Sequence, residues 1–214
     1  MSHSWDDRGY ASEYDCFVSI SNEEDLAVVD KVLSGDREAF AILLEKYQGK
    51  VRGYCANMIF NSVESDDLAQ EIFLKAYKSL ASFDGSAKFS TWLFSISSNH
   101  CKDHLRKAKV RKFMRFDSSQ ELSADEDPLA DLESRESIRR ILSSFSEQNR
   151  QILLLREYYG FTYEEIASHL KISIESVRAR LKRIRGKIDK SFAELARESG
   201  IKLRGIELKP GAKQ

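Results

Sequence analysis

Apolar residues recur along most of this chain at the three- and four-residue spacing of amphipathic α-helices. Leu26, Val29 and Leu33 form the first such stripe, which stops at Ser34-Gly35, and Asp36 is placed to cap the next helix. Further helices are predicted from Ser65 through Leu80, with Ser65 to Asp67 as cap and first turn, and from Phe89 onward. Between these two helices, residues 81–88 contain Gly85 and are predicted to form a loop.

Residues 116–128 lack periodicity and are rich in Ser, Asp and Glu, which predicts a linker. Helical spacing resumes at Leu132, and no strand-like alternation of useful length occurs. We therefore predict an all-α fold: two small helical domains joined by a flexible acidic linker, the C-terminal domain containing a helix-turn-helix. The expected boundaries are a flexible extension over 1–22, a first domain over 23–115, a linker over 116–131, a second domain over 132–190 and a tail over 191–214.

The helix-turn-helix is predicted within residues 162–187, TYEEIASHLKISIESVRARLKRIRGK. Thr162 and Glu165 have the spacing of a capping box at the start of the first helix, and Ser173 is placed to cap the second. A second helix of this kind lies in the DNA major groove in many regulators. Its expected inward face is Val177, Leu181, Ile184 and Ile188; its outward face is Glu175, Arg178, Ala179, Lys182 and Arg183; and Arg180, Arg185 and Lys187 flank it, where phosphates would pass.

Charge strengthens the nucleic-acid interpretation, although the formal net charge is zero, with 34 basic and 34 acidic residues. Basic residues gather in 102–115 and again in 178–187, whereas residues 117–136 are acidic. Two cationic helices separated by an acidic segment predict two contacts with one polyanion.

Several classes of protein are not expected. No apolar run approaches the length of a membrane span, and the N-terminus does not resemble a signal peptide. Three scattered cysteines, Cys16, Cys55 and Cys101, fit reduced thiols with small apolar roles, and together these features predict a cytoplasmic protein. No glycine-rich phosphate loop occurs, so no ATP site is expected, and we also expect no cofactor and no small-molecule substrate.

The blocks GDREAFAILLEKY (35–47), DDLAQEIFLKAYKSL (66–80) and KFSTWLFSISSNHCKDHLRK (88–107) resemble the second domain of bacterial sigma-70 factors. Residues 146–187 are similar to the fourth domain of the same family, and the blocks occur in family order. With no third domain evident, the resemblance is to the extracytoplasmic-function (ECF) group. It implies a polymerase subunit rather than an enzyme, which would bind core RNA polymerase, direct it to promoter DNA and help to open the duplex.

The resemblance also implies roles for individual residues. The helix carrying DLAQE would dock on core polymerase through Asp67, Gln70, Glu71 and Phe73. The minus-ten element of the promoter would be bound by Phe83, Asn99, Lys102, Arg106, Lys107 and Arg111, the first two holding unpaired bases. The minus-thirty-five element would be read by Glu175, Arg178, Ala179, Arg180, Lys182 and Arg183. Trp92 has the spacing of a core residue, although some family members use aromatic residues near this position to separate the strands.

The chain departs from the family pattern at Phe145-Ser146, where Leu-Pro is common and Ser can still cap the helix, and at two further positions. Lys171 occupies the turn where Gly is frequent, and it would cost about 1 kcal/mol if its φ is positive. Glu175 replaces a usual Gly at the start of the recognition helix, so promoter sequence is the least transferable inference.

Other interpretations were weighed. A stand-alone helix-turn-helix regulator accounts for residues 132–190 but leaves the upstream blocks unexplained. A metal site on His100, Cys101 and His104 lacks the further ligands that would complete it. An anti-sigma factor is an expected partner, because family members are commonly held inactive by one.

Overall fold

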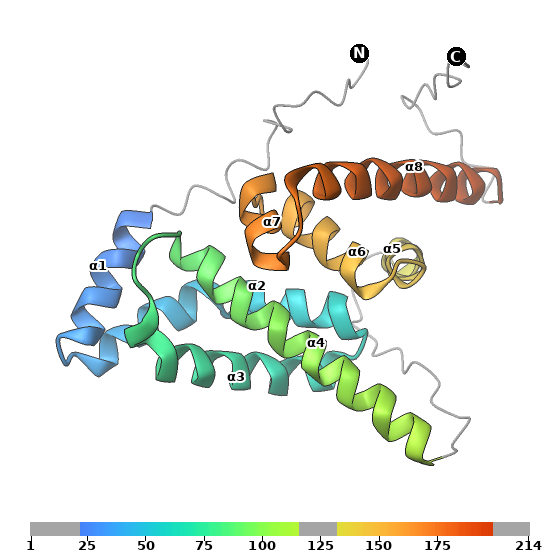
Figure 1. The fold of residues 1–214 in the computed structure, drawn as a ribbon. Helices are drawn as coiled ribbons and strands as arrows, with labels where there is room; N and C mark the ends of the chain where they lie inside the picture. The colour runs from blue at the N-terminus through green and yellow to red at the C-terminus, as the bar shows by residue number, and fades with distance from the viewer. Residues whose placement is uncertain (1–21, 116–131, 199–214) are drawn as a thin grey trace.

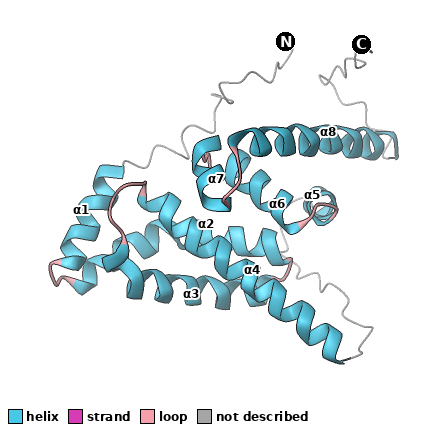
Figure 2. Ribbon diagram, in the orientation of Figure 1, coloured by secondary structure: helices cyan, strands magenta, loops and turns pink. Residues whose placement is uncertain are grey.

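The computed structural model describes residues 22–115 and 132–198, and these residues form helices, turns and loops with no strand. The predicted all-α class is therefore confirmed (Figure 2). The first domain contains α1 (Asn22–Leu33), the short 3₁₀ helix η2 (Arg37–Ala39), α2 (Phe40–Ile59), α3 (Ser62–Ser79), the 3₁₀ turn η3 (Leu80–Ser82) and α4 (Phe89–Arg115). The second contains α5 (Leu132–Ser143), α6 (Glu147–Leu153), the π-helical turn η4 (Leu154–Tyr158), α7 (Tyr163–Leu170) and α8 (Ile174–Glu198).

Side-chain caps begin several of these helices. Asp36 accepts a hydrogen bond from the Ala39 amide at 3.2 Å, although a 3₁₀ turn precedes α2 there. The predicted start of α3 at Ser65 is wrong: Asn61 caps that helix by accepting from the Glu64 amide at 3.2 Å, and Ser65 is buried inside it. The helix begins earlier because Phe60 ends α2 in the left-handed conformation, with φ 57°, and turns the chain directly into α3.

The core of the first domain is built from α2, α3 and α4, which Figure 1 shows lying across one another. Tyr47, Tyr54, Ile72, Phe89 and Leu93 are among its fully buried side chains. Cys55 and Cys101 are also buried, as predicted for small apolar roles, and their Sγ atoms lie 3.7 Å apart. Their mutual contact and their burial raise the pKa of the Cys101 thiol, which keeps it protonated and unreactive.

The hydrophobic core is continuous with the second domain, which packs against α2 and α4. Tyr159 contributes most visibly: its ring lies 4.2 Å from the Phe94 ring and 5.6 Å from the Tyr54 ring. Its hydroxyl donates to the Lys50 carbonyl of α2 at 2.8 Å. The linker, expected over 116–131, lies outside the described residues, as do the two terminal segments.

A buried guanidinium joins the two domains a second time. Arg150, on α6, is only 7% exposed and donates to the carbonyls of Leu142 at 3.1 Å, Phe145 at 3.3 Å and Met58 at 2.6 Å. It also stacks on the Phe60 ring, 4.1 Å from the centroid. Burial lowers the pKa of Arg150, but the carbonyl groups at helix ends compensate a cation well. The carbonyl of Phe60 accepts from Arg139 at 2.7 Å, so two arginines of the second domain hold the end of α2.

Candidate nucleic-acid and polymerase interfaces

The helix-turn-helix forms as predicted from its capping residues. Thr162 accepts from the Glu165 amide at 3.1 Å, and the Glu165 carboxylate accepts from the Thr162 amide at 2.8 Å, which completes the capping box. Ser173 Oγ accepts from the Ser176 amide at 3.2 Å and caps α8. Between the two helices, Lys171 has φ 54° and ψ 47°, so the non-glycine residue does occupy the left-handed region.

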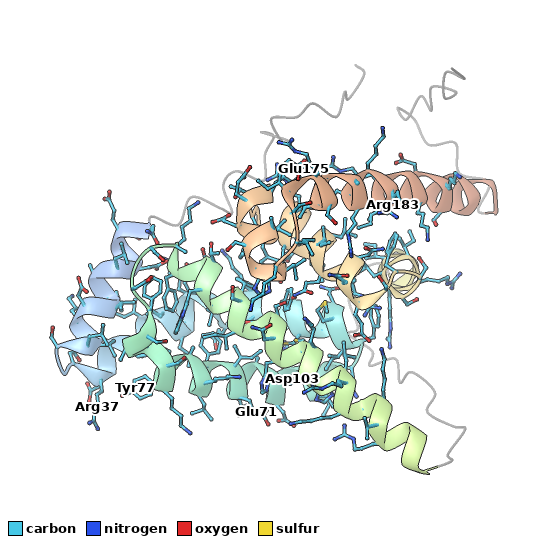
Figure 3. All side chains as sticks on the ribbon, viewed as in Figure 1. Arg37, Glu71, Tyr77, Asp103, Glu175 and Arg183 are labelled. Atoms are coloured by element: carbon cyan, nitrogen blue, oxygen red, sulfur yellow. The ribbon has the colours of Figure 1, made fainter. Side chains whose placement is uncertain are left out.

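Helix α8 is divided into a buried and an exposed face. Val177, Leu181 and Ile184 are fully buried, and Ile188 is half-buried beside them. The predicted outward residues Glu175, Arg178, Ala179, Lys182 and Arg183 are all exposed. Figure 3 shows α8 running along one edge of the molecule, with Glu175 near its start. The helix continues to Glu198, past the expected domain end at 190.

Neighbouring groups contact three arginines of α8, two on its flanks and one on its outward face. Arg180 donates to Gln148 Oε1 at 2.5 Å, and Arg185 donates to Glu157 Oε1 at 2.7 and 3.1 Å. Arg178 lies 5.5 Å from the centroid of the Tyr163 ring. These contacts orient the three guanidinium groups, and cations with a fixed geometry suit contacts to phosphate and to base edges.

Helix α3 presents a mixed polar and apolar surface. Asp67, Gln70 and Glu71 are exposed, as a docking role requires. The structure corrects the expected position of Phe73, whose side chain is 5% exposed and belongs to the core. Its spacing from the buried Leu68, Ile72 and Ala76 explains this placement.

Three exposed apolar residues of α3, one of them Val63 in its first turn, were missed at the sequence level. Leu74 is 60% exposed and Tyr77 is 37% exposed, and both follow Gln70 at helical spacing. In Figure 3 the labelled Glu71 and Tyr77 lie on α3 at the edge of the molecule opposite α8. Exposed large apolar groups among polar ones are typical of a protein-binding surface. A helical wheel of residues 62–79 alone would have indicated them.

Helix α4 carries the basic residues expected to follow DNA. Asn99, Lys102, Arg106, Lys107 and Arg111 are all exposed. Arg106 lies 3.1 Å from Asp103 on the same helix. On the face towards α3, His100 and His104 each approach a separate carboxylate, Glu71 at 2.7 Å and Glu64 at 2.8 Å. The two histidines thus pair with acids across the helix boundary, and no group of metal-ligating side chains was found within the described residues.

The structure also corrects the expected position of Phe83, in the loop between α3 and α4. Its ring is 8% exposed and packs 5.3 Å from Trp92 and 5.8 Å from Phe89. Trp92, predicted to be a core residue, is partly buried in this aromatic cluster. After Phe83 the loop turns at Gly85, whose φ is 71°, and the Asp84 carboxylate accepts from the Ser86 amide at 2.9 Å.

The family models for sigma-70 region 2 and sigma-70 region 4 match residues 43–111 and 135–188. The RNA polymerase sigma-H factor of Pseudomonas aeruginosa is 34% identical over 193 residues, which cover 84% of this chain and 100% of that protein. This chain belongs to the sigma-70 family. The ECF RNA polymerase sigma-E factor of Escherichia coli is 32% identical over 185 residues, which cover 81% of this chain and 96% of that protein. This similarity supports membership of the ECF group.

Two solved structures share the fold of this sigma factor. The sigma factor RpoE of Bartonella quintana, in complex with the anti-sigma factor NepR, has a TM-score of 0.61 at 22% identity and covers 72% of this chain and 96% of its own. CnrH, in complex with the cytosolic domain of CnrY, has a TM-score of 0.59 at 21% identity. The match covers 78% of this chain and 96% of the CnrH chain. Sigma factors are initiation factors for transcription, so the expectation of a non-enzymatic protein is confirmed by the family.

The described helices of this sigma factor include none with the length and apolarity to cross a lipid bilayer. Helices α3 and α8 lie at opposite edges of the molecule (Figure 3). A cavity of about 380 Å³ lies between the two domains. Its walls are the loop and the start of α4 on one side, including Phe83, Trp92 and Ser95, and helix α7 on the other, including Glu164, Ser168 and His169.

Proposed function

We propose that this sigma factor docks on core RNA polymerase through the exposed face of α3 and reads promoter DNA with α8 and α4. The proposal rests on two surfaces found in one chain of this family. One is a capped helix-turn-helix with outward cations, and the other is the separate face of α3 with exposed Gln70, Leu74 and Tyr77. A stand-alone regulator has no use for the second surface.

On α8, the exposed cations Arg178, Lys182 and Arg183 are proposed to contact the minus-thirty-five element. Arginine and lysine donate to guanine O6 and N7, and Ala179 leaves room for a base edge between them. Glu175, in the first turn, is placed to accept from a cytosine amino group. Arg180, held by Gln148, is proposed to bind a backbone phosphate at the edge of the groove.

On the first domain, Asn99 and the four cations after it are proposed to follow the non-template strand at the minus-ten element. Asn99 offers an amide for base-edge hydrogen bonds, while Lys102, Arg106, Lys107 and Arg111 neutralise phosphates. Phe83 would capture a base only after leaving the aromatic cluster in which it is buried. Strand separation would then be driven by the free energy of binding the single strand.

We further propose that the protein acts in the cytoplasm, where core polymerase resides, and that an anti-sigma factor restrains it. The second proposal is supported by the structural neighbour RpoE, which was solved in complex with the anti-sigma factor NepR. Affinity purification from the source cells, followed by competition between the captured protein and core polymerase, tests it. A captured protein that binds together with core, without competing, contradicts an anti-sigma role.

The test of the main proposal is reconstitution with core polymerase. A pool of random duplexes is selected for binding by the protein with core, and the enriched sequence is then used in run-off transcription. We expect a defined transcript only when both components are present. Enrichment of one sequence by the protein alone, with no stimulation of core, would instead support the stand-alone regulator.

A further inference from the structure

Helix α8 contains a glycine near its middle that no contact within the described residues explains. Gly186 is exposed, and a Cβ built on it would meet no atom within 4 Å. Glycine is less favourable than alanine in a helix interior, because the unfolded chain has more conformational freedom to lose there. The helix nevertheless continues through this position to Glu198. A glycine of this kind suits a place where a ligand approaches the backbone closely.

Gly186 lies on the face of α8 that points away from the rest of the protein. About two turns of helix separate it from Ala179, so the two residues share one line along the outward face. The buried residues Val177, Leu181 and Ile184 lie on the opposite side, and Figure 1 shows α8 along an outer edge of the molecule. Along this line the helix backbone is accessible between longer neighbouring side chains.

Cations surround this opening in the outward face. Four exposed ones lie within about one turn of Gly186, namely Lys182, Arg183, Lys187 and Lys190. Arg183 Nε donates to the Ala179 carbonyl at 3.3 Å, and no carboxylate of the described residues pairs with any of the four. The one acid within the same turn is the exposed Asp189, so the cations outnumber it. The surroundings therefore attract an anion.

A second exposed glycine, Gly49 of α2, has the open space but not the unpaired cations. A Cβ on Gly49 would also meet no atom within 4 Å. Its neighbour Lys46, however, lies 2.5 Å from Asp25 Oδ1, and Arg52 pairs with Asp66. Open space combined with unpaired cations thus distinguishes the glycine of α8.

We propose that Gly186, Lys187 and Lys190 form a binding site for one phosphodiester group of the DNA backbone. The inference rests on the proposed binding of α8 to the minus-thirty-five element. Gly186 lies about 10 Å along the helix axis from Ala179, and the major groove is about 12 Å wide. A helix that presents Ala179 to base edges therefore meets the backbone at the groove edge near Gly186. The missing side chain lets a phosphate approach the helix until both lysines reach it.

Gly186→Ala and Gly186→Leu test this phosphate site, because they fill the open space without changing any charge. Gly49→Ala and Gly49→Leu are the matched controls at an equally open position outside the proposed DNA contacts. Alanine and leucine are better helix formers than glycine, so we expect all four variants to melt about 1–4 °C higher than the wild type. Promoter binding is measured by gel shift over a salt series, with each protein reconstituted with core polymerase.

We expect promoter affinity to fall about threefold in Gly186→Ala and at least about tenfold in Gly186→Leu, and to stay unchanged in the Gly49 variants. The slope of log affinity against log salt concentration should become shallower by about one in Gly186→Leu, as for one lost phosphate contact. The base preference should not change. Weaker binding by a protein that melts higher excludes loss of folding as the cause.

Neutral methylphosphonates, placed one at a time in the promoter backbone, locate the contacted phosphate. One such substitution should weaken binding by the wild type and have little further effect in Gly186→Leu, because the contact is already lost. Lys190→Ala, which leaves the glycine in place, should abolish the effect at the same backbone position. A full effect of that methylphosphonate in both variants would contradict the assignment.

The phosphate site is refuted if the Gly186 variants bind the promoter as tightly as the wild type, or if Gly49→Leu loses as much affinity as Gly186→Leu. It is also refuted by an altered base preference at an unchanged salt slope, which would place a base at Gly186. Failure of the wild type to bind any promoter together with core polymerase instead refutes the proposed function. Normal binding by the wild type and the Gly186 variants alike refutes the phosphate site alone.

Discussion

Nε2 of His100, on α4, lies 2.7 Å from Oε2 of Glu71, on the exposed face of α3. The pair joins the helix proposed to follow DNA to the helix proposed to dock on polymerase. One turn further along α4, His104 lies 2.8 Å from Glu64 in the same manner. A polymerase group that binds Glu71 would therefore compete with His100 for the same carboxylate, and so affect the position of α4 relative to α3.

Glu71→Gln is the first test of the docking face, because it keeps the shape of the side chain and removes its charge. The side chain is 63% exposed, and we expect core affinity to fall about tenfold, or about 1.4 kcal/mol, as for a charged interface contact. Glu64→Gln is the control, since it removes the equivalent partner of His104. Titration of core polymerase with labelled protein measures both. Equal losses in the two variants would show that the histidine pairs, rather than docking, are responsible.

Arg183→Ala tests direct reading of DNA by α8. We expect binding of the reconstituted polymerase to the selected promoter to weaken by about 1–3 kcal/mol and its preference at one base pair to relax. Lys187→Ala, at an exposed position on the predicted flank, should weaken binding uniformly and reduce the salt slope by about one. Gel shifts over a series of salt concentrations and single-base variants separate the two effects. An unchanged base preference in Arg183→Ala would assign that residue to phosphate.

Lys171→Gly should stabilise the protein. Lys171 is held at φ 54°, where a side chain costs about 1 kcal/mol that glycine avoids. The greater conformational entropy of glycine in the unfolded chain offsets part of this gain in stability. We expect the midpoint of urea unfolding of the second domain to rise accordingly. Lys171→Ala removes the charge and retains the strain, so it should leave the midpoint nearly unchanged. A rise of the same size in both variants would attribute the effect to charge.

His169 should make the folding stability of the protein sensitive to acid. Burial, followed by the nearby charge of Lys102, lowers the pKa of His169 to about 4, against an ordinary value of 6.5. The unfolded chain binds a proton in this range and the folded one does not, so stability falls as pH drops from 6.5 towards 4. The loss is on the order of 2–3 kcal/mol.

Urea unfolding over this pH range, on the wild type and on His169→Gln, measures that contribution. The carboxylates of Asp84, Glu164 and Glu165 line the same cavity and are present in both proteins, and Gln151 lies 3.3 Å from the His169 ring in the wild type. The difference between the two pH curves therefore isolates the histidine. Parallel curves would show that His169 is as accessible to protons when folded as when unfolded.

The local features of this fold were predictable because they depend on residues close in sequence. The capping box at Thr162, the cap at Ser173 and the buried stripe of α8 all follow from spacing within one or two turns. The wrong prediction for the start of α3 also depended on nearby residues. Phe60 turns the chain at the end of α2, so the helix begins directly afterwards with Asn61, and not Ser65, as its cap.

The packing of the second domain against α2 and α4 was not predictable in this way. Periodicity indicates that a face of α2 or α4 is buried, but it does not indicate what covers that face. Arg150 belongs to a polar-looking segment, and its burial depends on carbonyls that come from residues as distant as Met58. Phe73 and Phe83 were expected at partner contacts by resemblance, whereas packing against neighbouring helices placed both rings in the core.

The carbonyls around Arg150 also decide how readily the domains can part and meet again. Leu142 and Phe145 belong to the same domain as Arg150, so two of its three acceptors move with it when the domains separate, and water replaces Met58. A buried ion pair in place of Arg150 and Met58 would leave an unpaired charge on each side, at a cost of several kcal/mol. Here the cation remains coordinated throughout. The contact with Met58 can therefore be broken and remade without leaving the Arg150 charge buried and unpaired.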